Sequence, residues 1–292
     1  EIRLSLVGSE MCIRDRHIFQ GEIMRILLIA DVHNVPHGSR RTLKTIGNVI
    51  KKTNCDLIVF LGDIVHGPST DTHYEKYLRQ VFDLTGNTPF ATVFGNHDDE
   101  GKTTKDEILA VAKSYKNCLT KGRDYVIDMM GESLLFIDSG SYYNGEGSYY
   151  DTVKQEQIDF VKSQIAGKKA ILFQHIIMPD IMDYIDQRNT KAYGYVRDGK
   201  KYYKFKGGVH YIGKLGECPC PPDINTGELE QLKDNLKAAV FGHDHKNTFE
   251  LYIDGVKFIQ CGGSGSNSYD KFWPSTVKIL DTKTLCTQII RL

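Results

Sequence analysis

The chain has 292 residues, of which 40% are hydrophobic, and its 37 Lys and Arg balance its 37 Asp and Glu. This composition is typical of one globular catalytic domain, and the zero net charge removes any global electrostatic argument for binding nucleic acid or membrane surfaces. No apolar run approaches the roughly 20 residues that a membrane span needs. We therefore expect no membrane partner, while nucleic acid is a possible partner that the composition does not indicate.

The first 23 residues differ from the rest of the chain. The stretch from Ser5 to Arg16 resembles the translation of a sequencing-adapter read-through, and Met24 would be an ordinary start just before an apolar run. We expect residues 1–23 to be a non-native extension and residues 24–292 to be the catalytic domain; the alternative is a genuine short extension. Charged residues interrupt any apolar core of a secretory signal in this stretch, which favours a cytoplasmic protein.

Five apolar runs, bounded by Gly or polar residues, are typical of buried strands. They cover residues 25–30, 57–61, 90–94, 170–173 and 238–241. Between them, apolar residues recur at helical spacing within 43–50, 77–82, 108–112 and 153–165. Strands that alternate with helices indicate an α/β fold built from crossover units, in which ligands gather beyond the carboxyl ends of the strands.

A short group of metal-ligand residue types follows each of the five strands. The groups are Asp31-Val32-His33, Gly62-Asp63, Gly95-Asn96-His97-Asp98, Gln174-His175 and Gly242-His243-Asp244-His245. Each group alone occurs by chance, but the ordered set at strand ends predicts a hydrolase with a dinuclear metal centre. Two ions held about 3.5–4 Å apart clamp a phosphoryl group and lower the pKa of the water between them.

The spacing inside the groups suggests how the ligands are shared. Asp31 and His33 are separated by one residue, so in an extended segment their side chains point to the same side and can share one ion. His243 and His245 repeat this geometry. Asp63 stands alone after its strand, which makes it the candidate for the bridging carboxylate.

The remaining donors would complete a second ion site. Asn96 offers an amide oxygen and His175 an imidazole, and together with His243 they form the expected second set. A mixture of nitrogen and oxygen donors without thiolates suits Mn, Fe, Zn, Ni or Co better than Ca or Mg. The expected cofactors are therefore two divalent or trivalent transition metal ions.

The order of these motifs resembles that of the calcineurin-like metallophosphoesterases, D-x-H, G-D, G-N-H-[DE], H and G-H-x-H. Further segments are similar to the divergent branch grouped with purple acid phosphatase-like proteins: Phe94–Glu100, Asp138-Ser139-Gly140, Gln174-His175-Ile176, and Cys218–Pro222 followed by Asn225-Thr226-Gly227. The resemblance runs from about Arg25 to Ser275. It implies a four-layer αββα sandwich, in which two facing mixed β-sheets are flanked by helices.

The resemblance also implies a role for each ligand. It makes Asp31, His33, Asp63 and His245 the first metal site, and Asp63, Asn96, His175 and His243 the second. His97 then stays outside the coordination as the acid or charge stabiliser at the leaving group, with Asp98 orienting it.

The reaction that the resemblance implies is an in-line attack of a bridging hydroxide on the phosphorus of a phosphomonoester. The substrate would be a phosphorylated small molecule or protein. The alternatives are a phosphodiesterase that acts on cyclic nucleotides or nucleic acid, since the same dinuclear centre serves both bond types, and a non-catalytic metal-binding scaffold.

One departure from the purple acid phosphatases concerns the residue three positions after the bridging Asp. Those enzymes carry a Tyr there and lack the His of D-x-H, whereas this chain has His66 at that position and retains His33. No tyrosinate-to-iron charge transfer is expected, so the protein should be colourless. His66 is interpreted either as a contact to the ligands or substrate, or as a plain loop histidine.

Substrate choice is expected to depend on an insertion at residues 187–222. From Arg188 to Lys214 the chain carries eight Lys or Arg against one acid, with six interleaved aromatic residues. Such groups could hold a phosphate and stack a base or aryl group. The plainer interpretation is a solvated hairpin over 196–205 that turns at Asp198-Gly199. A second aromatic cluster, Tyr142, Tyr143, Tyr149 and Tyr150, fits a site rim or simple packing equally well.

Overall fold

The computed structural model describes residues 23–37, 39–70, 72–146, 149–165, 167–186, 195–197, 200–266 and 273–292. The expected non-native extension over residues 1–23 lies, apart from its last residue, outside this part of the chain and stays a prediction.

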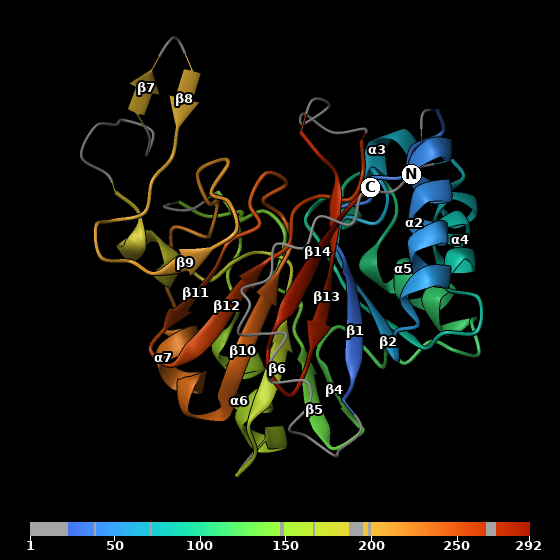
Figure 1. The fold of residues 1–292 in the computed structure, drawn as a ribbon. Helices are drawn as coiled ribbons and strands as arrows, with labels where there is room; N and C mark the ends of the chain where they lie inside the picture. Colours follow the sequence, from blue (N-terminus) through green and yellow to red (C-terminus); the bar gives the residue numbers. More distant parts are fainter. Residues whose placement is uncertain are drawn as a thin grey trace.

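Two mixed β-sheets form the centre of the molecule (Figure 1). In the five-stranded sheet β1, β2 and β3 are parallel, while β13 and β14 run antiparallel to their neighbours. Its spatial order is β14 (Thr287–Arg291), β13 (Thr276–Asp281), β1 (Arg25–Ile29), β2 (Leu57–Leu61) and β3 (Phe90–Val93). The seven-stranded sheet has the order β4 (Tyr125–Met129), β5 (Glu132–Phe136), β6 (Ala170–Phe173), β10 (Leu236–Phe241), β12 (Val256–Gln260), β11 (Glu250–Ile253) and β9 (Tyr211–Ile212).

Helices cover the outer face of each sheet. The five-stranded sheet carries α2 (Arg40–Thr53), α4 (Tyr74–Phe82) and α5 (Lys105–Lys113), whereas the seven-stranded sheet carries α6 (Gln155–Ile165), α7 (Glu228–Leu232) and the 3-10 helix η4 (Pro179–Tyr184). Short turns of helix complete the described elements: α3 (Gly67–Thr70), η2 (Asp83–Thr85), η3 (His97–Asp99) and η5 (Lys233–Asn235). The four-layer αββα sandwich predicted from the sequence is confirmed.

Alternation along each strand divides the core into three apolar layers. On β1, Leu27 and Ile29 belong to the cluster shared with α2, α4 and α5, while Ile26 and Leu28 belong to the cluster between the two sheets. Because side chains point to opposite faces with a period of two, a strand buried on both faces must be apolar throughout. This is why β1, β2, β3, β6 and β10 stand out in the sequence as continuous apolar runs, and all five predicted strands are present.

The predicted hairpin is also present. β7 (Tyr195–Arg197) pairs with β8 (Lys200–Tyr202) in antiparallel register, with Arg197 opposite Lys200. The hairpin projects from the same end of the molecule as α3 (Figure 1). Residues 187–194 and 198–199 lie outside the described part of the insertion, so a contact between its basic residues and a substrate stays a prediction.

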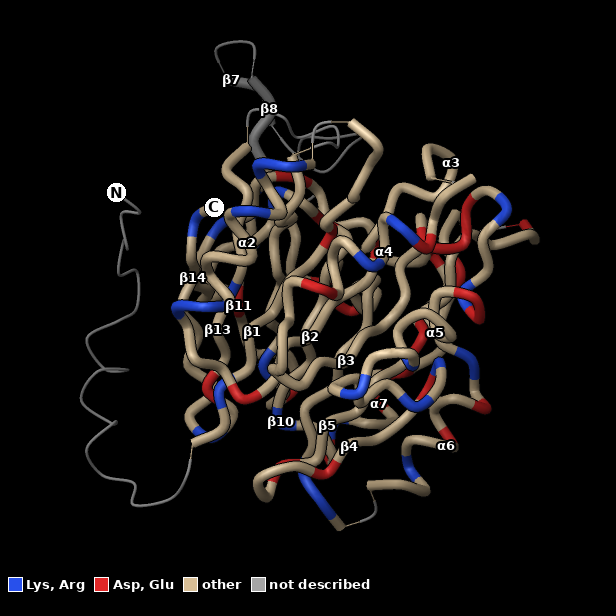
Figure 2. The backbone as a smooth tube through the Cα atoms, turned by 90° about the vertical axis from the view of Figure 1, so that its right-hand side faces the viewer, with Lys and Arg blue, Asp and Glu red and all other residues tan. Residues whose placement is uncertain are grey.

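Charge is spread without a single-sign face in the view that shows α4 and α5, where basic and acidic segments are interspersed (Figure 2). Among the described residues, no helix has the length and apolar character needed to cross a membrane. The cytoplasmic location stays a prediction.

Candidate metal centre

Four of the candidate ligands lie in loops and adopt left-handed backbone conformations. Asp31, His33, Asp63 and His243 have φ values of 51°, 43°, 50° and 72°. Such conformations cost non-glycine residues on the order of 1–3 kcal/mol each and persist only where the surrounding structure determines them. They aim the side chains that follow β1, β2 and β10 across the gap between the carboxyl ends of the two sheets.

Two glycines let these loops approach each other. A Cβ on Gly62, whose φ is +84°, would lie 2.6 Å from both the Gly95 nitrogen and His175 Nδ1. A Cβ on Gly95 would lie 2.0 Å from Asp63 Oδ1. The site therefore depends on glycine at both positions, because any side chain would displace backbone or a predicted ligand.

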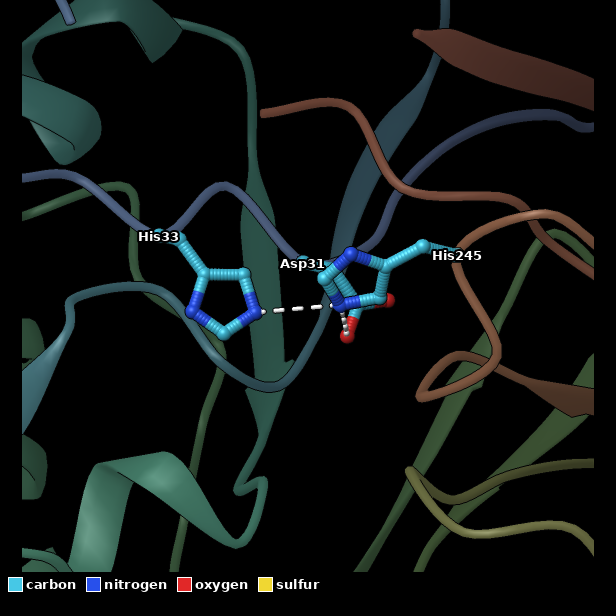
Figure 3. Close-up of side chains that lie close together, drawn as sticks. All are labelled: Asp31, His33 and His245. Carbon is cyan, nitrogen blue, oxygen red and sulfur yellow. Dashed lines mark hydrogen bonds and ion pairs between the residues drawn. The ribbon is translucent and has the colours of Figure 1, made fainter. Parts of the chain in front are cut away.

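The first cluster brings together Asp31, His33 and His245 (Figure 3). Their ligand atoms lie within 4.8 Å of one another. His33 Nε2 is 3.1 Å from His245 Nε2, and His245 Nε2 is 3.4 Å from Asp31 Oδ1. Two imidazole nitrogens and a carboxylate oxygen thus converge on one small volume, which could hold a metal ion.

A second cluster lies beside the first and contains Asp63, His175 and His243, again with ligand atoms within 4.8 Å of one another. Asp63 Oδ2 is 3.3 Å from His175 Nε2 and 3.6 Å from His33 Nε2. One carboxylate oxygen therefore lies between a histidine of each cluster, the position that a bridging ligand would occupy.

Three buried side-chain atoms in and beside these clusters lack a hydrogen-bond partner: Asp31 Oδ1, Asn96 Oδ1 and His175 Nε2. Buried polar atoms without partners are costly and call for an explanation. The other polar atoms of two of the same groups are engaged, since His175 Nδ1 is 2.6 Å from the Leu61 carbonyl and Asn96 Nδ2 donates to Tyr142. Because Nδ1 contacts a carbonyl oxygen, Nε2 is the nitrogen turned toward the clusters, 3.3 Å from Asp63 Oδ2 but without a hydrogen bond. Asp31 Oδ1 and His175 Nε2 lie 4.0 Å apart, and buried oxygen and nitrogen atoms without hydrogen bonds fit bound cations.

The electrostatics keep both carboxylates ionised. Burial alone would raise the pKa of Asp31, but His245 and His175 together outweigh burial and lower that pKa. Burial would likewise raise the pKa of Asp63, whereas His175 holds that pKa well below the ordinary value. Both side chains are therefore in the form that binds metal ions.

The surroundings shift the pKa values of the site histidines in different directions. Burial lowers the pKa of His33 to about 4 and that of His243 to about 3, so both rings are neutral and ready to coordinate. Burial would also lower the pKa of His175, but Asp63, Asp31 and the Leu61 carbonyl together outweigh burial and raise that pKa to about 9. A cation bound at His175 would displace a proton from the ring.

His97 lies against the clusters without belonging to either ligand set predicted from the sequence. One of its ring nitrogens is within 4.8 Å of ligand atoms of His33 and Asp63, and its ring centroid is 5.0 Å from that of His33. Its Nδ1 is 2.7 Å from Glu100 Oε2. His97 is thus at the edge of the site, where a leaving group could reach it.

Asp98 is buried and contacts backbone groups, so its expected role in orienting His97 stays a prediction. Its carboxylate accepts hydrogen bonds from three backbone N–H groups, those of Asp63 (2.8 Å), Ile64 (3.0 Å) and Gly95 (2.9 Å). These contacts tie the loop after β2 to the loop after β3. The carboxylate that contacts the His97 ring is that of Glu100, a residue that none of the sequence motifs identifies as part of the site.

Two features that the sequence left open lie at the rim. The His66 ring stacks on His97 with centroids 5.8 Å apart, and its Nδ1 is 2.7 Å from Ser69 Oγ. Tyr150 packs its edge against His243 with centroids 4.6 Å apart, and Tyr142 contacts Asn96. His66 and this part of the tyrosine cluster therefore border the site.

Residues 24–247 match the family model described as calcineurin-like phosphoesterase. The chain belongs to this family. The motif order seen in the sequence is therefore that of a true member.

Relatives and solved structures agree with the assignment. The chain is 25% identical over 262 residues to a probable inactive purple acid phosphatase of Arabidopsis thaliana, covering 78% of this chain and 63% of that relative, so it spans less than two thirds of the relative's length. It is 29% identical over 150 residues to a probable cyclic nucleotide phosphodiesterase of Psychrobacter arcticus, covering 48% and 50%. Its fold is similar to that of a dimetal phosphatase from Danio rerio, with a TM-score of 0.57 and 11% identity over 92% of this chain and 98% of that one.

Proposed function

We propose that the protein is a metal-dependent phosphohydrolase that cleaves phosphomonoesters at a dinuclear centre. Asp31, His33, Asp63 and His245 would hold one ion, and Asp63, Asn96, His175 and His243 the other. The ions would be drawn from Mn, Fe, Zn, Ni and Co, because the donors are imidazole nitrogens and hard oxygens without thiolates.

One observation carries this proposal. The unpartnered buried atoms Asp31 Oδ1, Asn96 Oδ1 and His175 Nε2 belong to three of the proposed ligands and come from three different loops. A site evolved only for packing would satisfy these atoms with hydrogen bonds or replace them with apolar groups. Membership of the phosphoesterase family supports the same reaction class.

The bound ions would supply a lowered pKa for a water between them and stabilisation of the phosphoryl oxygens. The side chains would orient the acid and supply the proton for the leaving group. His97, partly exposed beside His33 and Asp63, would protonate the departing alkoxide. His66, stacked on His97, would limit how far that ring can rotate.

A phosphodiesterase is the second candidate. The relative from Psychrobacter arcticus bears that activity in its name, over half of its length. A diester presents one phosphoryl oxygen fewer for charge stabilisation and carries a second alcohol group that must fit the rim. The size of the rim beside Tyr150 and the insertion at 187–222 would decide between the two ester classes.

Hydrolysis assays discriminate among these proposals. The protein is stripped of metal, supplied with Mn²⁺, and assayed with p-nitrophenyl phosphate and with bis(p-nitrophenyl) phosphate. Preferential cleavage of the monoester supports the proposal, and preferential cleavage of the diester supports the second candidate. Bound metal without turnover of either ester would favour a non-catalytic metal-binding scaffold; the name of the Arabidopsis relative describes that protein as probably inactive.

A further inference from the structure

Four side chains form a continuous hydrogen-bonded path from a proposed metal ligand to the proposed acid. Asn96 Nδ2 donates to the Tyr142 hydroxyl at 2.9 Å, and this hydroxyl donates to Glu100 Oε1 at 2.5 Å. The other carboxylate oxygen, Glu100 Oε2, is 2.7 Å from His97 Nδ1. One carboxylate therefore contacts both branches of the path, each through its own oxygen.

The direction of every hydrogen bond in this path follows from Glu100. An ionised carboxylate can only accept hydrogen bonds, so the Tyr142 hydroxyl donates its one proton to Glu100. The hydroxyl can then only accept a hydrogen bond from Asn96. The Asn96 amide must therefore turn its NH₂ to Tyr142, which leaves Oδ1 on the opposite side, where it is buried without a partner. By the same rule Nδ1 of His97 donates to Glu100, so that Nε2 faces the leaving group and must carry the proton that the ring gives to it.

Packing holds the tyrosine in this position. The Tyr142 ring stacks on Tyr150 with centroids 5.8 Å apart and an interplanar angle of 26°. Tyr150 in turn contacts the ring of His243. Residues 142 and 150 also form an isolated antiparallel bridge, which fixes the backbone of both. These contacts restrict rotation of the Tyr142 ring and hold its hydroxyl in place.

We propose that Glu100 and Tyr142 are positioning residues: Glu100 orients His97 toward the leaving group, and Tyr142 fixes the Asn96 amide with its oxygen toward the metal. The proposal rests on the function assigned above to His97 and Asn96. Tyr142 would then orient a metal ligand, a role beyond packing or lining the rim of the site.

Glu100→Gln tests the branch to His97. The glutamine keeps the shape but replaces one accepting oxygen with a donating NH₂, so it cannot accept from both Tyr142 and His97. Because proton donation matters most when the leaving group is poor, kcat/KM should fall at least about 10-fold more for an alkyl phosphate than for p-nitrophenyl phosphate. The control Asp99→Asn removes the same charge one residue away, where the carboxylate accepts from Ser141, and should change neither rate. Equal losses on both esters would overturn this branch.

Tyr142→Phe tests the branch to Asn96 and does not need turnover. Removing one oxygen frees the amide to flip, so the affinity for the more weakly bound Mn²⁺, measured by calorimetry, should fall about 10- to 100-fold. The control Tyr143→Phe removes the neighbouring hydroxyl and should leave both Mn²⁺ affinities unchanged. An unchanged affinity in Tyr142→Phe would overturn this branch.

The two readouts separate this proposal from the proposed function. If the wild-type protein binds Mn²⁺ but hydrolyses no ester, the phosphohydrolase proposal fails while the Mn²⁺ affinity of Tyr142→Phe still decides the positioning role of Tyr142. Should Glu100→Gln fail to fold, His97→Ala provides the reference. The ratio of its kcat/KM for the alkyl phosphate to its kcat/KM for p-nitrophenyl phosphate shows the effect of losing the acid completely. Glu100→Asp keeps a carboxylate, so its ratio should lie between those of His97→Ala and the wild type. A ratio outside this range would overturn the branch to His97.

Discussion

At the scale of single residues, Asp98 joins the loops after β2 and β3, which carry the proposed ligands Asp63 and Asn96, without being a proposed ligand itself. It is buried and accepts from three backbone N–H groups of two loops. Asn at this position offers one accepting oxygen and turns an NH₂ toward amide donors. Because a buried N–H group left without an acceptor costs about 1–3 kcal/mol, we expect Asp98→Asn to lower the free energy of unfolding by about 2 kcal/mol or more.

Urea denaturation of the metal-free protein measures this loss. The exposed neighbour is the control, and Asp99→Asn should stay within about 0.5 kcal/mol of the wild type. If Asp98→Asn unfolded like the wild type but selectively slowed hydrolysis of esters with poor leaving groups, Asp98 would orient His97 after all.

The sequence shows the candidate ligands more clearly than the residues that support them. Ligand residue types at strand ends are visible in the sequence because the chemistry restricts them to a few kinds of side chain. Asp98 and Glu100 are both carboxylates near His97, and spacing alone does not say which one faces the ring. The answer depends on η3, because in a 3-10 helix side chains at i and i+3 eclipse and this places Glu100 over His97.

At the scale of elements, the close contact of the loops after β2 and β3 requires Gly62. Gly62→Ala would combine a left-handed backbone, at φ +84°, with a Cβ 2.6 Å from backbone. Gly255 is a matched control, because its φ is +82° and no heavy atom lies within 4 Å of its added Cβ. Both alanine variants should lose about 1 kcal/mol for the backbone conformation, but only Gly62→Ala should also lose bound Mn²⁺.

Metal content by mass spectrometry after gel filtration distinguishes the two variants. Two ions in Gly255→Ala and fewer than two in Gly62→Ala are expected. Equal metal content in both proteins would mean that the loops tolerate the extra methyl group, and that close approach at Gly62 does not shape the site.

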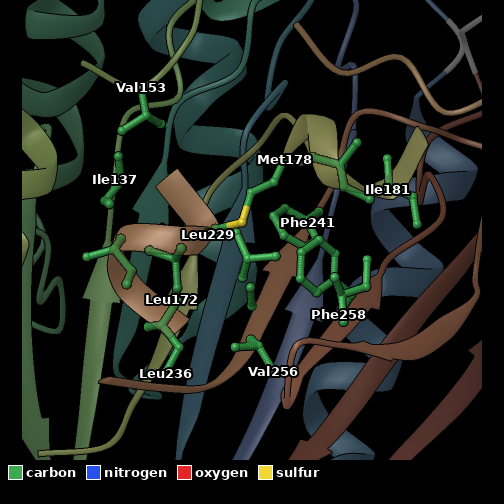
Figure 4. Close-up of a cluster of buried hydrophobic side chains, with 14 of the residues drawn as sticks. Ile137, Val153, Leu172, Met178, Ile181, Leu229, Leu236, Phe241, Val256 and Phe258 are labelled. Atoms are coloured by element: carbon green, nitrogen blue, oxygen red, sulfur yellow. The ribbon is translucent and has the colours of Figure 1, made fainter. Parts of the chain in front are cut away.

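Sequence patterns identified five strands and four helices and missed the remaining strands of the two large sheets, among them the interior strands β5, β12 and β13. Strands buried on both faces are continuously apolar, and four helices carry an apolar face long enough to show its period. The helix α7 has five residues, too few to show a period. Leu229 of α7 and Leu236 at the start of β10 nevertheless belong to the same buried cluster as Phe241 and Phe258 (Figure 4). Strands β4, β9, β11 and β14 lie at or near sheet edges, where polar residues interrupt the apolar pattern.

At the scale of the whole molecule, a buried ion pair connects the two sheets. Glu250 on β11 lies 2.6 Å from Lys278 on β13 and 2.8 Å from Lys257 on β12. Burial alone would raise the pKa of Glu250, but the attraction of the two lysines outweighs burial and lowers that pKa from 4.5 to about 2. The ionised carboxylate therefore favours the folded state.

The sign of the pH dependence follows from this lowered pKa. Its contribution of about 3 kcal/mol is fully present above pH 4.5, where the carboxylate is ionised in the folded and unfolded states alike, and it is lost as the pH falls toward 2. The wild type should therefore lose stability over this window relative to Glu250→Gln, measured by urea denaturation. The exposed control Glu156→Gln should follow the wild-type curve; a constant difference between Glu250→Gln and the wild type from pH 5 to pH 2 would contradict the assignment.

The central claim is that Asp63 lies between two metal ions, and anomalous diffraction from crystals soaked in Mn²⁺ tests it most directly. The account predicts two anomalous peaks about 3.5–4 Å apart, one bordered by Asp31, His33 and His245 and the other by His175 and His243, with Asp63 between them. A single peak, or peaks located away from these side chains, would contradict it.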